Sequence, residues 1–272
     1  MRALGKLLTK NQRGPGRTAV IAASNPLTCF ANYPSIEQRM STSRIIIPLD
    51  YPTTRLAEEF VARVSPHDCA LKVGKELFTA AGPDLVSRLV RRGFRIFLDL
   101  KYHDIPNTVA MACKAAGDLG VWMLDVHASG GIAMLTAARE ALAAGPERPL
   151  LIGVTVLTSL DEAALQQLGI VEGVARHAER LARLTHESGL DGVVCSAWEA
   201  EAIKSAHGAG FLAVTPGIRL AEGNAHDQAR IATPEAAVRA GADFLVIGRA
   251  ITQASDPQAV LNRINTAIGT RP

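Results

Sequence analysis

Alternating acidic and basic side chains in one short segment give this sequence its clearest chemical signal. The segment runs from Asp99 to Asp104 (DLKYHD) and follows an apolar run. Side chains alternate along a strand, so Asp99 and Lys101 are expected on one face and Leu100 on the other. Asp104 is expected just past the strand, and Lys72, at the end of the preceding strand, can approach the same place. The pattern predicts two ammonium groups and two carboxylates in a small volume.

Such a cluster predicts the stabilisation and protonation of a carbanion. A lysine flanked by carboxylates should stay protonated, because nearby negative charge favours its cationic form. That suits a proton donor rather than a Schiff-base nucleophile, which must be neutral. Preorganised charge aimed at a developing negative centre is commonly a large part of catalysis, and a carboxylate beside a substrate carboxylate would disfavour the ground state. The structural alternative is an ion-pair network at one end of the fold, although desolvating four charges is costly.

The elements that must position this cluster alternate between strand and helix from Arg44 onward. The expected strands are Ile45–Leu49, Ala70–Val73, Arg95–Leu100, Met123–Val126, Leu150–Val156, Gly192–Cys195, Leu212–Thr215 and Phe244–Ile247. The expected helices are Arg55–Val64, Pro83–Arg92, Asn107–Leu119, Ile132–Ala144, Arg176–Glu187, Glu199–Ala206, Pro234–Ala240 and Pro257–Ile268. Eight such units predict an α/β fold, a single-domain (β/α)8 or TIM barrel. An open doubly wound sheet is the alternative, but no GxGxxG follows the first strand.

Polar residues recur where the expected strands end, which is the catalytic end of such a barrel. They are Asp50, Lys72, Asp99, Lys101, His127, Thr155, Thr158, Arg219 and Arg249. The loops after strands seven and eight commonly form a phosphate site. Gly248 lets the backbone approach a ligand closely, and Arg249 can bind phosphate with two hydrogen bonds. The loop Leu220–Gln228 is expected to close over the ligand.

The blocks around these residues resemble the orotidine 5'-phosphate decarboxylases in their bacterial form. The resemblance rests on Phe97–Thr108 (FLDLKYHDIPNT), Leu49–Tyr51, Leu71–Lys75, Val126–Gly131, Val154–Ser159, Thr215–Arg219 and Val246–Arg249. A single DxKxxD motif is weak, because related barrels share it. All these blocks in barrel order are specific, and they cover roughly Arg44 to Ile268.

The resemblance implies decarboxylation of orotidine 5'-phosphate to UMP, the last step of de novo pyrimidine nucleotide synthesis, without metal or cofactor. It implies that Lys101 protonates C6 of the pyrimidine, with Asp99 beside the departing carboxylate and Lys72 completing the charge array. It also implies a homodimer with shared sites, because Asp104 and Thr108 of such enzymes reach the partner's active site. The remaining implied substrate contacts are Asp50 to a ribose hydroxyl, Thr158 to the pyrimidine edge, and Arg219, Gln228, Gly248 and Arg249 to the phosphate.

Two other functions stay open at this point. One is a metal-dependent sugar-phosphate decarboxylase or epimerase of the same suprafamily, which shares the DxKxxD block. The other is a nucleotide-binding module without turnover, against which the complete charge set argues.

Composition disfavours several classes of protein. The formal net charge is +3, without a dense basic run, so nucleic-acid binding is not expected. No apolar stretch reaches the ~18 residues of a membrane span. The scattered cysteines at 29, 69, 113 and 195 indicate neither a disulfide framework nor a zinc site, and predict a reducing cytoplasmic location.

Residues 1–43 differ in character from the rest. This segment is basic and contains no acid before Glu37, and Met40 would make a natural start. We predict a disordered extension without a catalytic part over residues 1–43, and the barrel over residues 44–272.

Overall fold

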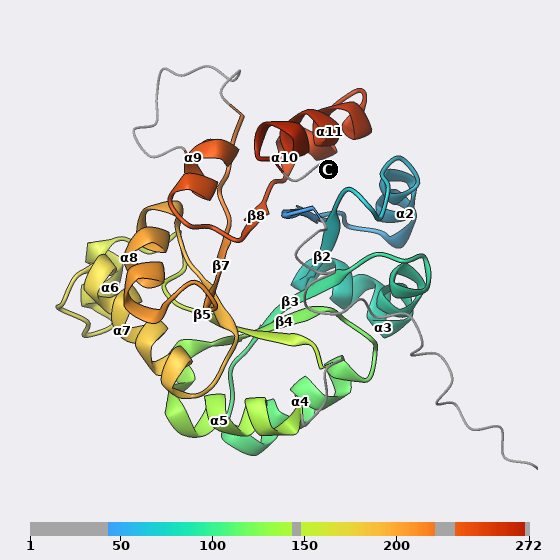
Figure 1. Cartoon of the computed structure of the whole chain (residues 1–272). Coiled ribbons are helices and arrows are strands. Elements are labelled where there is room, and N and C mark those ends of the chain that lie inside the picture. The colour runs from blue at the N-terminus through green and yellow to red at the C-terminus, as the bar shows by residue number, and fades with distance from the viewer. Residues whose placement is uncertain (1–42, 143–147, 221–231, 270–272) are drawn as a thin grey trace, which may run out of the picture. The chain divides into compact units, whose positions relative to one another are not determined.

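Eight parallel strands close into a barrel in the computed structural model, which describes residues 43–142, 148–220 and 232–269. The strands are neighbours in chain order, and β8 pairs with β1 through Ile45 and Leu245. Helices lie outside the strands and connect them (Figure 1). The predicted (β/α)8 barrel is therefore confirmed.

The strand bounds agree with the expected ones to within about two residues at each end. Differences of this size are usual, because the sequence pattern is weakest where a strand ends. The strands are β1 Ile45–Pro48, β2 Ala70–Gly74, β3 Ile96–Tyr102, β4 Met123–His127, β5 Leu150–Val154, β6 Gly192–Val194, β7 Leu212–Thr215 and β8 Phe244–Val246. The helices are α2 Thr54–Val61, α3 Lys75–Arg91, α4 Pro106–Gly117, α5 Gly131–Ala141, α6 Glu162–Gln167, α7 Val174–Glu187, α8 Ala197–His207, α9 Pro234–Arg239, α10 Arg249–Thr252 and α11 Pro257–Ala267. A 3-10 turn spans Ala128–Gly130.

Helix α3 begins eight residues before the expected helix at Pro83. The chain is non-helical at Gly82, whose φ of 67° lies in the left-handed region that glycine adopts readily. Proline at position 83 can start a helical segment but lacks the N–H that would continue one. The prediction therefore found only the part beyond the kink. The short helices α6 and α10 were not predicted, because four to six residues carry little periodicity.

Side chains that alternate along each strand divide the core into two parts. In β1, Ile46 points into the barrel, where it packs with Phe97 and Met123. Its neighbours Ile45 and Ile47 belong instead to the larger cluster between the strands and the surrounding helices. Parallel strands buried on both faces need such continuous apolar runs, which explains why the sequence is rich in Ile, Val and Leu.

The same alternation carries charged side chains inward near the carboxyl ends of the strands. In β2, β3 and β4, a residue of the apolar interior is followed two positions later by a charged residue, so both point the same way. The pairs are Ala70 and Lys72, Phe97 and Asp99, and Met123 and Asp125. The apolar interior thus lies beneath a layer of charged side chains.

Ser43, the last residue of the predicted extension, contacts helix α11 through Asn265. Ser43 is buried, its hydroxyl donates to Asn265 Oδ1 at 2.7 Å, and it accepts from the Ile45 N–H at 3.0 Å. Residues 1–42 lie outside the described residues, so the predicted extension stays a prediction. Within the described ranges, no helix is both long and apolar enough to cross a membrane.

Candidate active site

A cavity of about 960 Å³ opens at the carboxyl ends of the strands. Its lining comes from strands or strand-end loops around most of the barrel, as expected for a (β/α)8 active site. The lining residues used below are Asp50, Lys72, Asp99, Lys101, Val154, Leu157, Thr158, Val194, Val214, Ile218, Arg219, Val246, Gly248 and Arg249.

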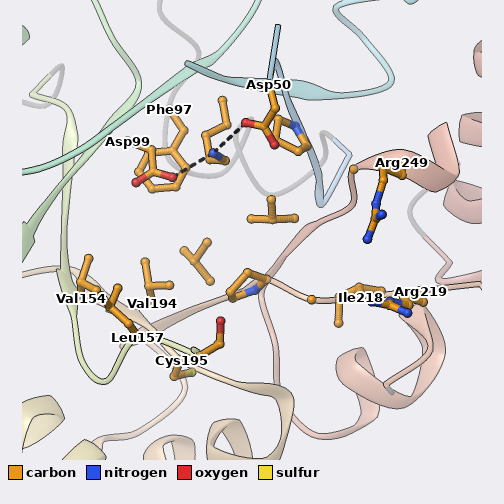
Figure 2. Close-up of a pocket in the computed structure, with 18 of the residues that line it drawn as sticks. Asp50, Phe97, Asp99, Val154, Leu157, Val194, Cys195, Ile218, Arg219 and Arg249 are labelled. Carbon is orange, nitrogen blue, oxygen red and sulfur yellow. Dashed lines mark ion pairs between the residues drawn. The ribbon is translucent and has the colours of Figure 1, made fainter. Parts of the chain in front are cut away.

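Asp99 links two lysines at the floor of this cavity. Its Oδ2 lies 3.0 Å from Lys72 Nζ, and its Oδ1 pairs with Lys101 Nζ. Lys72 also lies 3.8 Å from Asp50 Oδ1, and Figure 2 marks both Lys72 ion pairs. The Asp99 side chain is only 9% exposed, whereas that of Asp50 is 71% exposed. The predicted contact between Asp99, Lys101 and Lys72 is therefore present, with Asp50 at its outer edge.

An irregularity in β3 aims Lys101 at Asp99. Between the paired residues Leu98 and Tyr102, β3 advances four positions, while β4 advances only two, from Leu124 to Val126. Lys101 has a φ of 50°, the one positive φ at a non-glycine residue in the described ranges. Such backbone strain costs roughly 1–3 kcal/mol and gathers at functional sites, where surrounding contacts maintain it. Simple strand alternation predicted the right neighbours but not this bulge.

The second carboxyl group beside Lys101 is Asp125 of β4, which the sequence reasoning missed. Its Oδ1 accepts a hydrogen bond from the Lys101 backbone N–H at 2.8 Å, and its Oδ2 lies 4.0 Å from Lys101 Nζ. The side chain is fully buried. The one available signal was an acidic residue in the middle of an otherwise apolar strand, which is costly unless the carboxyl group has partners.

The pKa values of the two buried carboxyl groups are shifted in opposite directions. Burial acts to raise the pKa of Asp99. The Lys72 charge, the Asp125 side chain and the Lys101 ammonium group outweigh this effect and hold the pKa of Asp99 well below its usual value. Burial also raises the pKa of Asp125, and the neighbouring Asp99 raises it further, well above the usual aspartate value. Asp99 is therefore the carboxylate that carries negative charge on the cavity floor.

Apolar side chains line the cavity across from the charged floor. Valines at 154, 194, 214 and 246 come from four consecutive strands, β5 to β8. Leu157 and Ile218 extend this wall, and Figure 2 shows both on the far side of the cavity from Asp99. A flat, weakly polar ring fits between such a wall and a charged floor, because apolar lining with a few polar groups favours and orients a ligand.

Two arginines mark a separate, cationic end of the cavity. Arg219 follows β7 and Arg249 begins α10 after β8, and both are exposed. They lie on the opposite side of the cavity from Asp99 (Figure 2). At Gly248 a Cβ atom would meet Pro48 Cγ at 3.3 Å, so a larger residue there would crowd β1. The pair can bind a phosphate group through charge-assisted hydrogen bonds.

Asp104 does not join the charge cluster within its own chain. It is exposed, does not line the cavity, and accepts from the Ile105 backbone N–H at 2.6 Å. Thr108, on the first turn of α4, is likewise exposed and outside the cavity. The expectation of Asp104 in one small volume with Lys72, Asp99 and Lys101 is thus not met inside this chain.

Four other predicted positions have different outcomes. Thr158 lines the cavity as expected. Thr155 is buried and donates to the Val194 carbonyl oxygen at 2.9 Å, so its role is structural. Gln228, with most of the loop Leu220–Gln228, lies outside the described residues. His127 does not line the cavity, and its ring lies 5.4 Å from that of His103.

Taken together, the described geometry can hold an anionic group between Arg219 and Arg249 and a ring against the valines. It can then present a lysine ammonium group beside a buried carboxylate to that ring. Charge arranged in advance in a partly water-excluded site stabilises a developing negative centre strongly.

Comparison with known proteins gives one consistent family. Residues 43–264 match the model of the orotidine 5'-phosphate decarboxylase / HUMPS family. A protein called orotidine 5'-phosphate decarboxylase from Laribacter hongkongensis is 61% identical over 229 residues, which cover 84% of this chain and 94% of that protein. One of the same name from Hydrogenovibrio crunogenus is 54% identical over 226 residues, covering 83% and 96%. The crystal structure of orotidine 5'-phosphate decarboxylase from Lactobacillus acidophilus is similar, with a TM-score of 0.75, 38% identity, and coverage of 83% of this chain and 99% of that one. The chain therefore belongs to the orotidine 5'-phosphate decarboxylase / HUMPS family.

Proposed function

We propose that this enzyme decarboxylates orotidine 5'-phosphate to UMP, with Lys101 as the proton donor. The observation that carries the proposal is the Lys72–Asp99–Lys101 array on the floor of a cavity whose other end holds Arg219 and Arg249. The family match and the names of the relatives support the same reaction. As the last step toward UMP, it serves pyrimidine nucleotide synthesis.

The proposed step breaks one carbon–carbon bond and forms one carbon–hydrogen bond. The bond from C6 of the pyrimidine to its carboxylate breaks, carbon dioxide leaves, and the electron pair remains on C6. The Lys101 ammonium group stabilises this negative centre and transfers its proton to C6. Asp99, whose low pKa keeps it ionised, would lie beside the substrate carboxylate and favour its departure. Lys72 offsets the Asp99 charge on the side toward the ribose.

The remainder of the substrate fits the rest of the cavity. The pyrimidine would lie against the valines, with Thr158 at its edge. Asp50, exposed beside Lys72, would accept a hydrogen bond from a ribose hydroxyl. Arg219, Arg249 and the Gly248 backbone would bind the phosphate, and Gln228 would join them. Binding energy from these remote contacts can then stabilise the transition state at the charged floor.

We also propose a homodimer in which each site takes Asp104 and Thr108 from the partner subunit. Both residues are exposed and outside the cavity of their own chain, so they are available to a second copy. Large apolar side chains are exposed nearby in the sequence: Ile105 is 67% exposed and Met111 is 53% exposed. Exposed apolar groups of this size commonly mark an interface.

A cytoplasmic location is the remaining proposal. The three described cysteines, Cys69, Cys113 and Cys195, are free and buried, which is typical of a reducing compartment. Recovery of the native enzyme in the cytosolic fraction of disrupted cells would support this location, and recovery elsewhere would contradict it.

The loss of orotidine 5'-phosphate absorbance in the presence of EDTA tests the proposed reaction. We expect full turnover with the chelator, because protein side chains supply all the charges of the proposed step. Turnover of a sugar phosphate that EDTA abolishes would establish the metal-dependent alternative. Nucleotide binding without turnover would establish a binding module.

Replacing Arg249 with alanine is expected to raise KM for orotidine 5'-phosphate and to lower kcat/KM by roughly 10- to 100-fold. This is the effect of losing charge-assisted hydrogen bonds to a phosphate. Steady-state kinetics measure it. For the nucleoside orotidine, which lacks the phosphate, kcat/KM of the variant should be close to that of the wild type. Arg91→Ala, on the exposed surface of α3, is the matched control and should behave as wild type. An equal loss with both substrates would contradict a phosphate contact.

A further inference from the structure

Asp125 lies beneath the active-site floor and has no part in the proposed step. It is fully buried and is not among the residues that line the cavity. A buried acid in the middle of a barrel strand is costly, so its contacts should explain why it is there.

The first contact supports the unusual backbone of Lys101. Asp125 Oδ1 accepts the Lys101 backbone N–H at 2.8 Å, where the chain bulges between Leu98 and Tyr102. Without this acceptor, the Lys101 N–H would lose its hydrogen bond within the bulge, and the left-handed φ of 50° would lose its support.

The second carboxyl oxygen of Asp125, Oδ2, receives no hydrogen bond from any of the described residues. Lys101 Nζ lies 4.0 Å away, beyond hydrogen-bonding distance, and pairs with Asp99 instead. The Asp99 side chain lies close enough to that of Asp125 to act on its pKa. A hydrogen bond between the two carboxyl groups, which would give Oδ2 a partner, forms only when one of them carries a proton.

The charged groups around Asp99 and Asp125 favour Asp125 as the residue that holds this proton. Asp99 has two ammonium partners, Lys72 and Lys101, whereas within the described part of the chain Asp125 has only the more distant Lys101. Tyr102 and Cys113 also lie within electrostatic range, and burial raises the pKa of each to about 12, so neither supplies a charge near neutral pH. A shared proton therefore belongs on Asp125.

We propose that Asp125 is a positioning residue that works as a neutral carboxylic acid: its Oδ1 accepts from the Lys101 backbone and its Oδ2–H donates to Asp99. The inference rests on the proposed decarboxylation. One side chain thereby sets the distance between the proton donor and its carboxylate partner. A shift of about 1 Å in either group is enough to cost ~100-fold in rate.

The test compares two replacements of similar size. In Asp125→Asn, the amide oxygen can accept from Lys101 and the amide nitrogen can donate to Asp99, so kcat/KM should stay within roughly tenfold of wild type. In Asp125→Leu, both hydrogen bonds are lost, and kcat should fall by about 100-fold or more while UMP binding changes little. Asp84→Asn, which removes an exposed carboxylate from α3, is the control.

Two outcomes of these kinetics would overturn the inference. If Asp125→Asn loses as much activity as Asp125→Leu, the negative charge matters and the acid is not neutral. If Asp125→Leu turns over like wild type, the residue positions nothing. The wild-type assay keeps the two proposals apart: turnover by the wild type supports the decarboxylase whatever the variants do, and its absence removes the function itself.

Two measurements on well-folded protein decide the protonation state even if the leucine variant does not fold. The infrared difference between wild type and Asp125→Asn at neutral pH should contain the carbonyl band of a protonated carboxylic acid; a carboxylate band instead would overturn the inference.

The melting temperatures of the same pair provide the second measurement. A carboxyl group whose pKa is raised on folding makes its full contribution to the stability of the folded state at pH values below its unfolded pKa of about 3.9. That contribution is lost as the pH rises toward the folded pKa. The melting temperature of Asp125→Asn relative to wild type should therefore increase from about pH 4 upward, and a constant difference would contradict a neutral acid.

Discussion

Lys101→Ala is expected to lower kcat by roughly 10⁴-fold or more while the enzyme still binds UMP. Loss of a general acid alone typically costs 10²- to 10⁴-fold, and here the same ammonium group also stabilises the negative centre on C6. The product has no carboxylate and makes most of its contacts at the valines, at Asp50 and at the two arginines. Its affinity should therefore depend much less on Lys101 than the transition state does.

Single-turnover kinetics and UMP titration measure the two halves of this expectation. Lys114→Ala is the control, because Lys114 is an exposed lysine on α4 that pairs with Asp118 at 2.8 Å. It removes the same charge from the chain and should leave kcat unchanged. A Lys101→Ala enzyme with more than a small fraction of wild-type turnover would show that the proton comes from another group.

Mixing two inactive variants, Lys101→Ala and Asp104→Ala, should restore up to about one quarter of wild-type activity. In a two-fold symmetric dimer with shared sites, a mixed dimer has one site with both residues intact and one site lacking both. Random exchange makes half of the dimers mixed, and half of their sites are intact. The gain over either parent is large because each parent alone has no intact site.

The matched control for this experiment mixes Lys101→Ala with Asp99→Asn. Asp99 and Lys101 pair within one chain, so every site in a mixed dimer would still lack one of them. No activity should return. When the mixed dimers of Lys101→Ala and Asp104→Ala are isolated with two different affinity tags before the assay, one of their two sites is intact, so the expected activity rises to about one half. If tagged mixed dimers of Lys101→Ala and Asp104→Ala stay inactive, Asp104 does not act across the interface.

The barrel and most of the cavity could be predicted from local pattern. Strand and helix periodicity depends on residues within a few positions of one another, and eight alternating units allow few closed arrangements. Residues at strand ends, such as Lys72, Asp99 and Arg249, could therefore be assigned to one face of the barrel, and the structure places all three around one cavity.

The arrangement of charge around Lys101 could not be predicted in this way. The bulge between Leu98 and Tyr102 depends on how β3 pairs with β4, and no residue of β3 encodes that register by itself. Asp125 was overlooked because its partner lies on another strand, 24 positions earlier in the chain. Asp104 follows Lys101 closely in sequence, yet it is exposed and outside its own cavity.

The sequence by itself thus determined the family of folds, the end of the barrel where chemistry occurs and most residues found there, because period and order along the chain are local properties. Only the tertiary structure decided which carboxyl groups surround Lys101 and which of them is ionised. Distance between strands and burial from water set those two outcomes, since an electrostatic interaction depends on where a group lies in space and not on its position in the chain.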